Sequence, residues 1–241
     1  VTLESGSTLQ GKGDPEGAGT LQNQSLIDNT GYSLDVNMSG ALTTQSGGRF
    51  RVSGGGTTTV RAQTDFTTLG TGVFDLDGGD ATLFGDGSST KNLDAMVKFD
   101  TFARSGGNLT LQTGTFDLTS ASATQATALG TLILQDTTIQ NGQVGAIIAK
   151  GTTARLGDNL LLTADVDVTS GNLHVEEDLN SSGSIVFNIG DNNSADTLYF
   201  DSGAHAAQAV KSGVTLNLGH AGANISISSG KTVTLESGSP P

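Results

Sequence analysis

Carboxylates are the side chains of this 241-residue chain that are best placed to do chemistry. Asp75, Asp77 and Asp80 fall within one short segment, DLDGGD. Ca²⁺ takes about six to eight oxygen ligands in a flexible loop, so these three aspartates are weak calcium candidates. The segment departs from the Gly-Gly-x-Gly-x-Asp repeat of calcium-binding β-rolls and occurs once. We therefore expect no cofactor, with calcium as the alternative left open.

Other acidic pairs raise the question of polysaccharide chemistry. The best further candidates are Asp165 with Asp167 on one strand, and Asp191 with Asp196 in DNNSAD. A glycosidase needs two carboxylates facing each other about 5 to 10 Å apart, and such enzymes often present aromatic platforms to the sugar. The chain has no Trp and two Tyr. We expect no catalytic residues, and a polysaccharide-active enzyme is the second alternative.

The three histidines, His174, His205 and His220, show no metal-ligand spacing, and the chain has no cysteine to join them. His174 alternates with Leu173 and Val175, so we expect it to be a solvated outward residue. The chain also has no Gly-x-Ser-x-Gly or His-Glu-x-x-His motif. The residue types thus favour a binding or structural role over catalysis.

Composition and charge narrow the class of protein further. The chain has 35 Gly, 3 Pro and 34% apolar residues, which predicts a thin core. Its 11 Lys and Arg against 24 Asp and Glu give a net charge of -13. Nucleic acid and anionic membranes both need clustered cations, and no apolar run reaches the roughly 18 residues of a membrane span. We expect neither nucleic-acid binding nor membrane insertion.

The elements that must position these residues are very short strands. Two apolar residues flanking one other residue recur along the chain, and each such triplet predicts a strand with one inward face. Gly, Ser, Asn and Asp lie between the triplets and let the chain turn. The pairs include Leu34/Val36, Phe50/Val52, Phe74/Leu76, Leu109/Leu111, Phe116/Leu118, Val166/Val168, Leu173/Val175, Phe187/Ile189, Leu198/Phe200, Leu216/Leu218, Ile225/Ile227 and Val233/Leu235.

Longer repeats indicate how these strands are arranged. TGVFDL at residue 71 recurs as TGTFDL at residue 113, and GNLTL at residue 107 recurs as GNLHV at residue 171. The offsets of 42 and 64, and another 42 from Gly171 to Gly213, are near multiples of about 21. We predict an all-β fold, a single-stranded parallel and right-handed β-helix or solenoid of about 11 coils. An antiparallel all-β domain is the alternative.

We expect residues 1–241 to form a single solenoid domain, as one module or subunit of a longer array. Three segments break the strand pattern, near residues 92–104, 120–130 and 203–211, and predict short helices or loops protruding from corners. Leu93, Met96 and Val97 have helical spacing after a candidate cap at Asn92. Such excursions are places where a ligand could bind.

The two ends carry the same seven residues. VTLESGS begins at residue 1 and again at residue 233. A solenoid exposes an open strand edge at each end, so identical strands could stack between subunits or tandem modules. Two related coils within one chain are the simpler interpretation. The predicted assembly interface comprises Val1, Thr2, Leu3, Glu4, Val233, Thr234, Leu235 and Glu236.

In style the sequence resembles the passenger rods of Gram-negative autotransporters and the haemagglutinin-type adhesins. The most typical stretches are GNLTLQTGTFDLTS, SGNLHVEEDLNSSGSIVFNIGDN and GVTLNLGHAGANISISSGKTVTLESGS. No signature residue accompanies the likeness. It implies a secreted or cell-surface protein of bacterial type, with a structural or adhesive task in a surface layer or biofilm matrix.

We therefore expect a non-catalytic extracellular structural protein, a fibre or filament subunit or stalk module that partners with itself end to end. The first alternative is a ligand-binding adhesin or phage-type fibre domain that contacts surface glycans.

Overall fold

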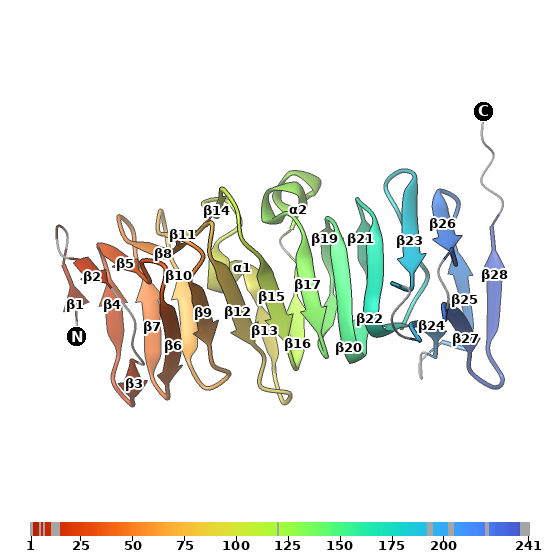
Figure 1. Cartoon of the computed structure of the whole chain (residues 1–241), viewed down its shortest axis with the longest axis horizontal. Helices are drawn as coiled ribbons and strands as arrows, with labels where there is room; N and C mark the ends of the chain where they lie inside the picture. The colour runs from red at the N-terminus through yellow and green to blue at the C-terminus, as the bar shows by residue number, and fades with distance from the viewer. Residues whose placement is uncertain are drawn as a thin grey trace. The chain divides into compact units, whose positions relative to one another are not determined.

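The computed structural model describes residues 2–4, 6, 8–10, 15–119, 121–191, 195–201, 205–219 and 222–236. Its strands stack in parallel on their equivalents in the next coil (Figure 1), which confirms the predicted β-solenoid. The solenoid has about 9 turns rather than the expected 11 or so. The difference arises because many coils are longer than the expected repeat. No helix in the described ranges is long and apolar enough to cross a membrane.

The chain divides into two compact units, Val1–Gly114 (unit 1) and Thr115–Pro241 (unit 2). The strands of unit 1 are β1 (Thr2–Leu3), β2 (Thr8–Gln10), β3 (Glu16–Gly17), β4 (Leu21–Asn23), β5 (Leu26–Asp28), β6 (Ser33–Met38), β7 (Ala41–Thr44), β8 (Arg49–Ser53), β9 (Thr57–Val60), β10 (Asp65–Thr68), β11 (Val73–Asp77), β12 (Asp80–Phe84), β13 (Thr90–Asn92), β14 (Ala103–Arg104) and β15 (Leu109–Gln112), with helix α1 (Leu93–Val97).

Unit 1 has three parallel sheets, one on each side of its coils. Their strand orders are β1-β4-β7-β10, β2-β5-β8-β11-β14 and β3-β6-β9-β12-β15. Each coil therefore contributes one strand to each sheet, and residues of one column recur at the same inward position. Ile27, Phe50 and Phe74 form such a column, and each stacks in register on the next.

Aromatic rings fill much of the interior of unit 1. Phe50 and Phe74 are fully buried and stack with centroids 5.7 Å apart. Phe66 meets Phe50 edge to face at 5.4 Å, and Phe102 stacks on Phe74 at 6.0 Å. Such aromatic pairs are worth about 0.5–1.5 kcal/mol beyond the burial of their area. This ring column ties neighbouring coils of unit 1 together.

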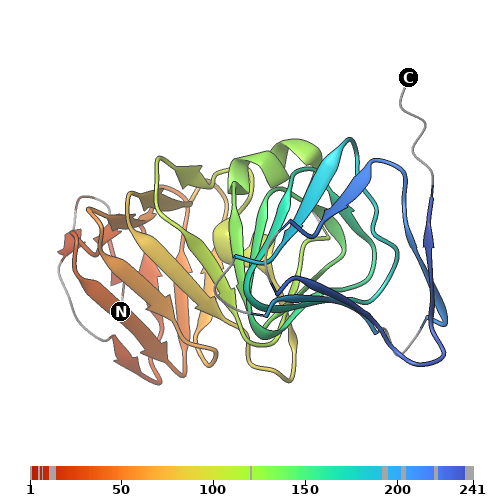
Figure 2. The ribbon, with the colours of Figure 1, turned by 45° about the vertical axis from the view of Figure 1, so that its right-hand side comes forward.

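The elements of unit 2 are β16 (Thr115–Asp117), α2 (Ala123–Leu129), β17 (Leu132–Gln135), β18 (Thr138–Gln140), β19 (Gly142–Val144), β20 (Ile147–Leu156), β21 (Leu160–Leu162), β22 (Val166–Val175), β23 (Ile185–Ile189), β24 (Thr197–Phe200), β25 (Ala207–Val210), β26 (Val214–Asn217), β27 (Asn224–Ile227) and β28 (Thr232–Leu235). Two of them, β20 and β22, are long bent strands that cover two sides of a coil (Figure 2).

Coils of unit 2 vary widely in length. One column runs through Leu132, Ile147, Val166, Phe187 and Leu216. The step from Phe187 to Leu216 is nearly twice as long as the step from Leu132 to Ile147. The inward positions keep their register, because the extra residues enter at the corners between strands. A uniform coil length is therefore not the rule.

The sequence offsets of 42 do not mark equivalent places two coils apart. Gly171 pairs with Gly151, whereas Val214, directly after Gly213, pairs with Ile185 on another side of the coil. The GNLTL and GNLHV repeats instead mark a shared corner geometry. A Cβ on Gly107 would lie 1.9 Å from the Gly79 carbonyl oxygen, and one on Gly171 would lie 1.8 Å from that of Gly151. Glycine is required there by close backbone approach.

Two of the three predicted insertions contain the expected helices. The Asn92 side chain caps α1, and Leu93, Met96 and Val97 are buried. This helix contacts β10 rather than standing away from the corner, and Thr68 Oγ1 donates a hydrogen bond to the Met96 carbonyl.

The second insertion contains α2, which begins with a capping box formed by Ser122 and Gln125. The third expectation was wrong for its described part, because Ala207–Val210 form strand β25, paired with β28. Residues 202–204 lie outside the described residues, as does residue 120.

Candidate functional site

The three calcium candidates are held by other side chains of unit 1. Asp75 is buried on β11 and forms an ion pair with Arg49, Nη1 to Oδ2 at 3.1 Å. Burial raises the pKa of Asp75, although the Arg49 charge opposes that effect. Asp77 accepts a hydrogen bond from Ser105 Oγ at 2.7 Å.

Asp80 accepts hydrogen bonds from the Asn108 main-chain and side-chain nitrogens at 2.7 and 3.0 Å. Within the described ranges, the carboxylates of Asp75, Asp77 and Asp80 do not gather into a group with metal-ligand spacing. Each candidate instead has a protein partner in a neighbouring coil.

Asp28 and Arg51 form a buried link on the outward side of the same sheet. The Asp28 carboxylate is fully buried and accepts hydrogen bonds from Arg51 Nε at 3.0 Å and Ser53 Oγ at 2.7 Å. Burial alone would raise the pKa of Asp28, but the hydrogen bonds from Ser53, Thr30 and Arg51 outweigh it and lower the pKa. Arg51 Nη1 also lies 3.8 Å from Asp77. This arrangement stabilises the stack of coils.

The other acidic pairs also have structural partners. Asp165 accepts from the Val186 main-chain nitrogen at 2.8 Å, and Asp167 accepts from Asn188 Nδ2 at 2.8 Å. Asp196 is fully buried and accepts from the Gly171 main-chain nitrogen at 2.6 Å. These carboxylates hold backbone and amide groups between coils, as buried polar groups generally must.

His174 alternates with buried Leu173 and Val175 as expected, but it is covered by neighbouring side chains, so the expectation that it is solvated was wrong. Its ring stacks on Tyr199 with centroids 4.7 Å apart, and Nδ1 lies 2.6 Å from Asp201 Oδ2. Nε2 lies 3.2 Å from the Thr152 carbonyl oxygen. The contact follows from the register, because His174 on β22 pairs with Tyr199 on β24. Both ring nitrogens face acceptors, which favours a structural role.

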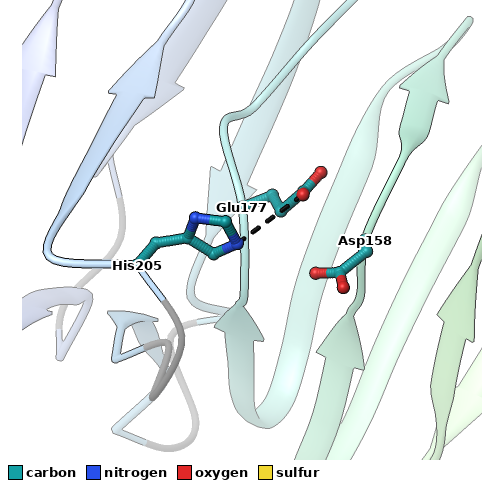
Figure 3. Close-up of side chains that lie close together, drawn as sticks. All are labelled: Asp158, Glu177 and His205. Carbon is teal, nitrogen blue, oxygen red and sulfur yellow. Dashed lines mark ion pairs between the residues drawn. The ribbon is translucent and has the colours of Figure 1, made fainter.

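One cluster of possible metal ligands has no signal in the sequence. The ligand atoms of Asp158, Glu177 and His205 all lie within 4.8 Å of one another (Figure 3). His205 Nε2 is 3.6 Å from Glu177 Oε1. The three residues occupy successive coils of unequal length, so no fixed spacing in the sequence could have aligned them.

The last coil of unit 2 repeats the inward columns but leaves them exposed. Ile227 stacks in register on Phe200, and Leu235 on Val210. Phe200 and Val210 are 0% and 3% exposed, whereas Ile227 and Leu235 are 50% and 70% exposed. Strand β28 pairs only with β25 in the described part of the chain, so its other edge is open there (Figure 2).

The predicted interface residues divide between the two ends. Val233, Thr234 and Leu235 lie on β28, with Glu236 directly after it. Thr2 and Leu3 form β1, which pairs with β4, and Glu4 follows as an exposed residue. Val1 lies outside the described residues. In the same first coil, Leu9 is 45% exposed although it stacks on buried Ile27.

No family model, curated protein or solved structure matches the chain.

Proposed function

We propose that the chain is a non-catalytic structural module of the cell exterior that extends by stacking its last coil on the first coil of another copy. The observation that carries the proposal is the exposure of Ile225, Ile227 and Leu235 at column positions whose counterparts one coil earlier are buried. A further coil would cover these side chains. Fully burying a Leu or Ile side chain contributes about 1.5–3 kcal/mol relative to exposure.

The repeated heptapeptide makes the first coil a suitable occupant of this surface. Strands β1 and β28 both lie within a VTLE sequence, so the two strands have the same residue types in the same order. A parallel pair in register would place each residue type against its own kind, as identical stacked strands do. A contact between two different ends of the same protein is heterologous. Such contacts generate an open filament when the rotation from one subunit to the next does not close into a ring.

The assembly is tested with two neighbouring substitutions on β28. Leu235→Asp places a charge at the inward column position, whereas Thr234→Asp places the same charge on the outward side of the strand. Leu235 and Thr234 are exposed in the single chain, so both variants are expected to keep the parent β-sheet circular dichroism. Light scattering across concentrations and negative-stain microscopy should show polymers for the parent and for Thr234→Asp, and short particles for Leu235→Asp.

Two results would contradict the proposal. A parent chain that stays a single particle at every concentration rules out end-to-end stacking, and polymers of Leu235→Asp equal to those of the parent rule out this surface. The non-catalytic part is tested separately by incubation with acidic glycans. New reducing ends or unsaturated products would overturn it.

A further inference from the structure

We propose that Asp158, Glu177 and His205 form a binding site for a divalent transition-metal ion, with Zn²⁺ as the ion that fits best. The three residues lie at one corner of successive coils in unit 2. Asp158 falls between β20 and β21, Glu177 follows β22, and His205 precedes β25. This site uses none of the exposed column residues Ile225, Ile227 and Leu235, and it does not depend on the proposed assembly.

The donor types favour a transition metal over calcium. The cluster offers one imidazole nitrogen and two carboxylate oxygens. Zinc accepts His and Asp or Glu together, and its catalytic-type sites have three protein ligands with a fourth position open. Calcium and magnesium prefer all-oxygen surroundings. The imidazole of His205 therefore favours zinc over calcium at this site.

The geometry is close to what such an ion needs. Zinc bonds to nitrogen and oxygen are about 2.0–2.2 Å, which places neighbouring ligand atoms roughly 3.3 Å apart. His205 Nε2 and Glu177 Oε1 are 3.6 Å apart. The side chains of Asp158, Glu177 and His205 point toward one another from three neighbouring segments (Figure 3). Asp158 is exposed, and its ligand atom lies within 4.8 Å of those of Glu177 and His205.

Neighbouring groups hold the ligands in place. The Asn159 main-chain nitrogen donates to Glu177 Oε2 at 2.8 Å, which leaves Oε1 directed at His205. Lys231 Nζ donates to the His205 carbonyl oxygen at 2.6 Å and fixes the backbone from the next coil. A hydrogen bond to a ligating carboxylate, such as the one from Asn159 to Glu177, orients the ligand for a metal.

The local charge also favours a cation. The carboxylates of Asp158 and Glu177 approach each other at the corner, and Asp178 follows Glu177 directly in the chain. Lys211 lies 3.1 Å from Asp178 and 2.9 Å from Glu236, so it is directed at those carboxylates. A bound ion would offset the repulsion and join three coils at one point, which stabilises the folded unit by mass action.

The test is a titration of the full chain with Zn²⁺ against a chromophoric chelator, together with Co²⁺ absorption as an optical probe of coordination. We expect one ion per chain, and an affinity at least about tenfold weaker in His205→Ala and in Glu177→Gln. Zn²⁺ should raise the Tm of the parent and not that of these two variants. Ca²⁺ at equal concentration should not displace it.

The matched control is Glu176→Gln, which removes the same charge one residue away. Glu176 pairs with Arg155 at 3.2 Å and lies outside the cluster. A second control, His174→Ala, removes a different histidine, whose ring stacks on Tyr199 outside the cluster. Both controls should bind Zn²⁺ as the parent does. Circular dichroism of each variant separates loss of ligand from loss of fold.

Three results would overturn the site. These are no stoichiometric binding by the parent, unchanged affinity in folded His205→Ala and Glu177→Gln, or equal loss in the controls.

Discussion

Unit 1 and unit 2 are both built from stacked parallel coils, but their interiors and their surface contacts differ. Unit 1 stacks phenylalanine rings along its interior and contains four of the five arginines of the chain, Arg49, Arg51, Arg61 and Arg104. The columns of unit 2 are mainly Val, Ile and Leu, and its carboxylates accept chiefly from amides and backbone nitrogens. Two different sets of contacts thus hold neighbouring coils together, and in both units the inward columns stay in register.

The variants with the largest expected effect on stability compare the two interiors. Phe74→Ala and Phe187→Ala remove fully buried rings. Each should lower the free energy of unfolding by about 3–5 kcal/mol. Phe74 contacts Phe50, Phe66 and Phe102, whereas the strand partners of Phe187 are Val166 and Leu216. We expect the Phe74 variant to lose about 1 kcal/mol more, because aromatic pairs contribute beyond their area.

Urea unfolding followed by hydrogen exchange with mass spectrometry measures this difference, since peptides report each unit by itself. Phe187→Leu and Phe74→Leu serve as milder controls that keep an apolar side chain. Equal losses for the two alanine variants would mean that the ring column adds nothing to unit 1 beyond burial.

The second difference concerns arginine. Arg51→Met leaves the fully buried Asp28 carboxylate without its charged partner, which should lower the stability of unit 1 by about 1–3 kcal/mol. Arg155→Met breaks a pair with Glu176 in which both side chains are about one third exposed, and it should cost about 0–1 kcal/mol.

The same exchange measurement checks these values. The double variant Asp28→Asn with Arg51→Met should regain part of the loss, because no buried charge is then unpaired. If the double variant is less stable than Arg51→Met, the unpaired Asp28 carboxylate is not the cause of the stability lost in Arg51→Met.

The strands could be predicted well from the sequence, and their spacing poorly. Pairs such as Phe50/Val52 and Leu198/Phe200 are buried as the alternation indicated. Strand alternation is a local property of two-residue period, so it survives any change in coil length. The coil length depends on corner residues, which carry no periodic signal. Steps as unequal as those from Leu132 to Ile147 and from Phe187 to Leu216 therefore could not be read from offsets between repeated motifs.

Because coil length varies, the sequence also did not show which side chains from neighbouring coils contact each other. His174 was expected to be solvated because its strand alternates, yet Tyr199 and Asp201 cover it from the next coil. Asp158, Glu177 and His205 are likewise unrelated in the sequence and close in space. The helix at Leu93–Val97 was predictable, because its cap and its apolar spacing are local.

The smallest expected difference is the response of the two units to acid. Burial raises the pKa of Asp75 in unit 1, so its charged form weakens the fold at neutral pH. The unfavourable contribution of Asp75 to stability disappears as the pH falls through its folded pKa, because the carboxyl group is then neutral. Asp28 acts in the opposite direction, because its lowered pKa contributes stability that disappears as the pH falls through its folded value.

In unit 2, burial would raise the pKa of Asp178, but the Ala209 main-chain nitrogen and Lys211 outweigh it and lower the pKa. The contribution of Asp178 is therefore present above its unfolded pKa and is lost in acid. Exchange measured from pH 7 to pH 3 should show the stability of unit 1 rising before it falls, and that of unit 2 only falling. Asp75→Asn should abolish the rise, because the neutral amide does not titrate. A rise that persists in this variant would assign it to another carboxylate.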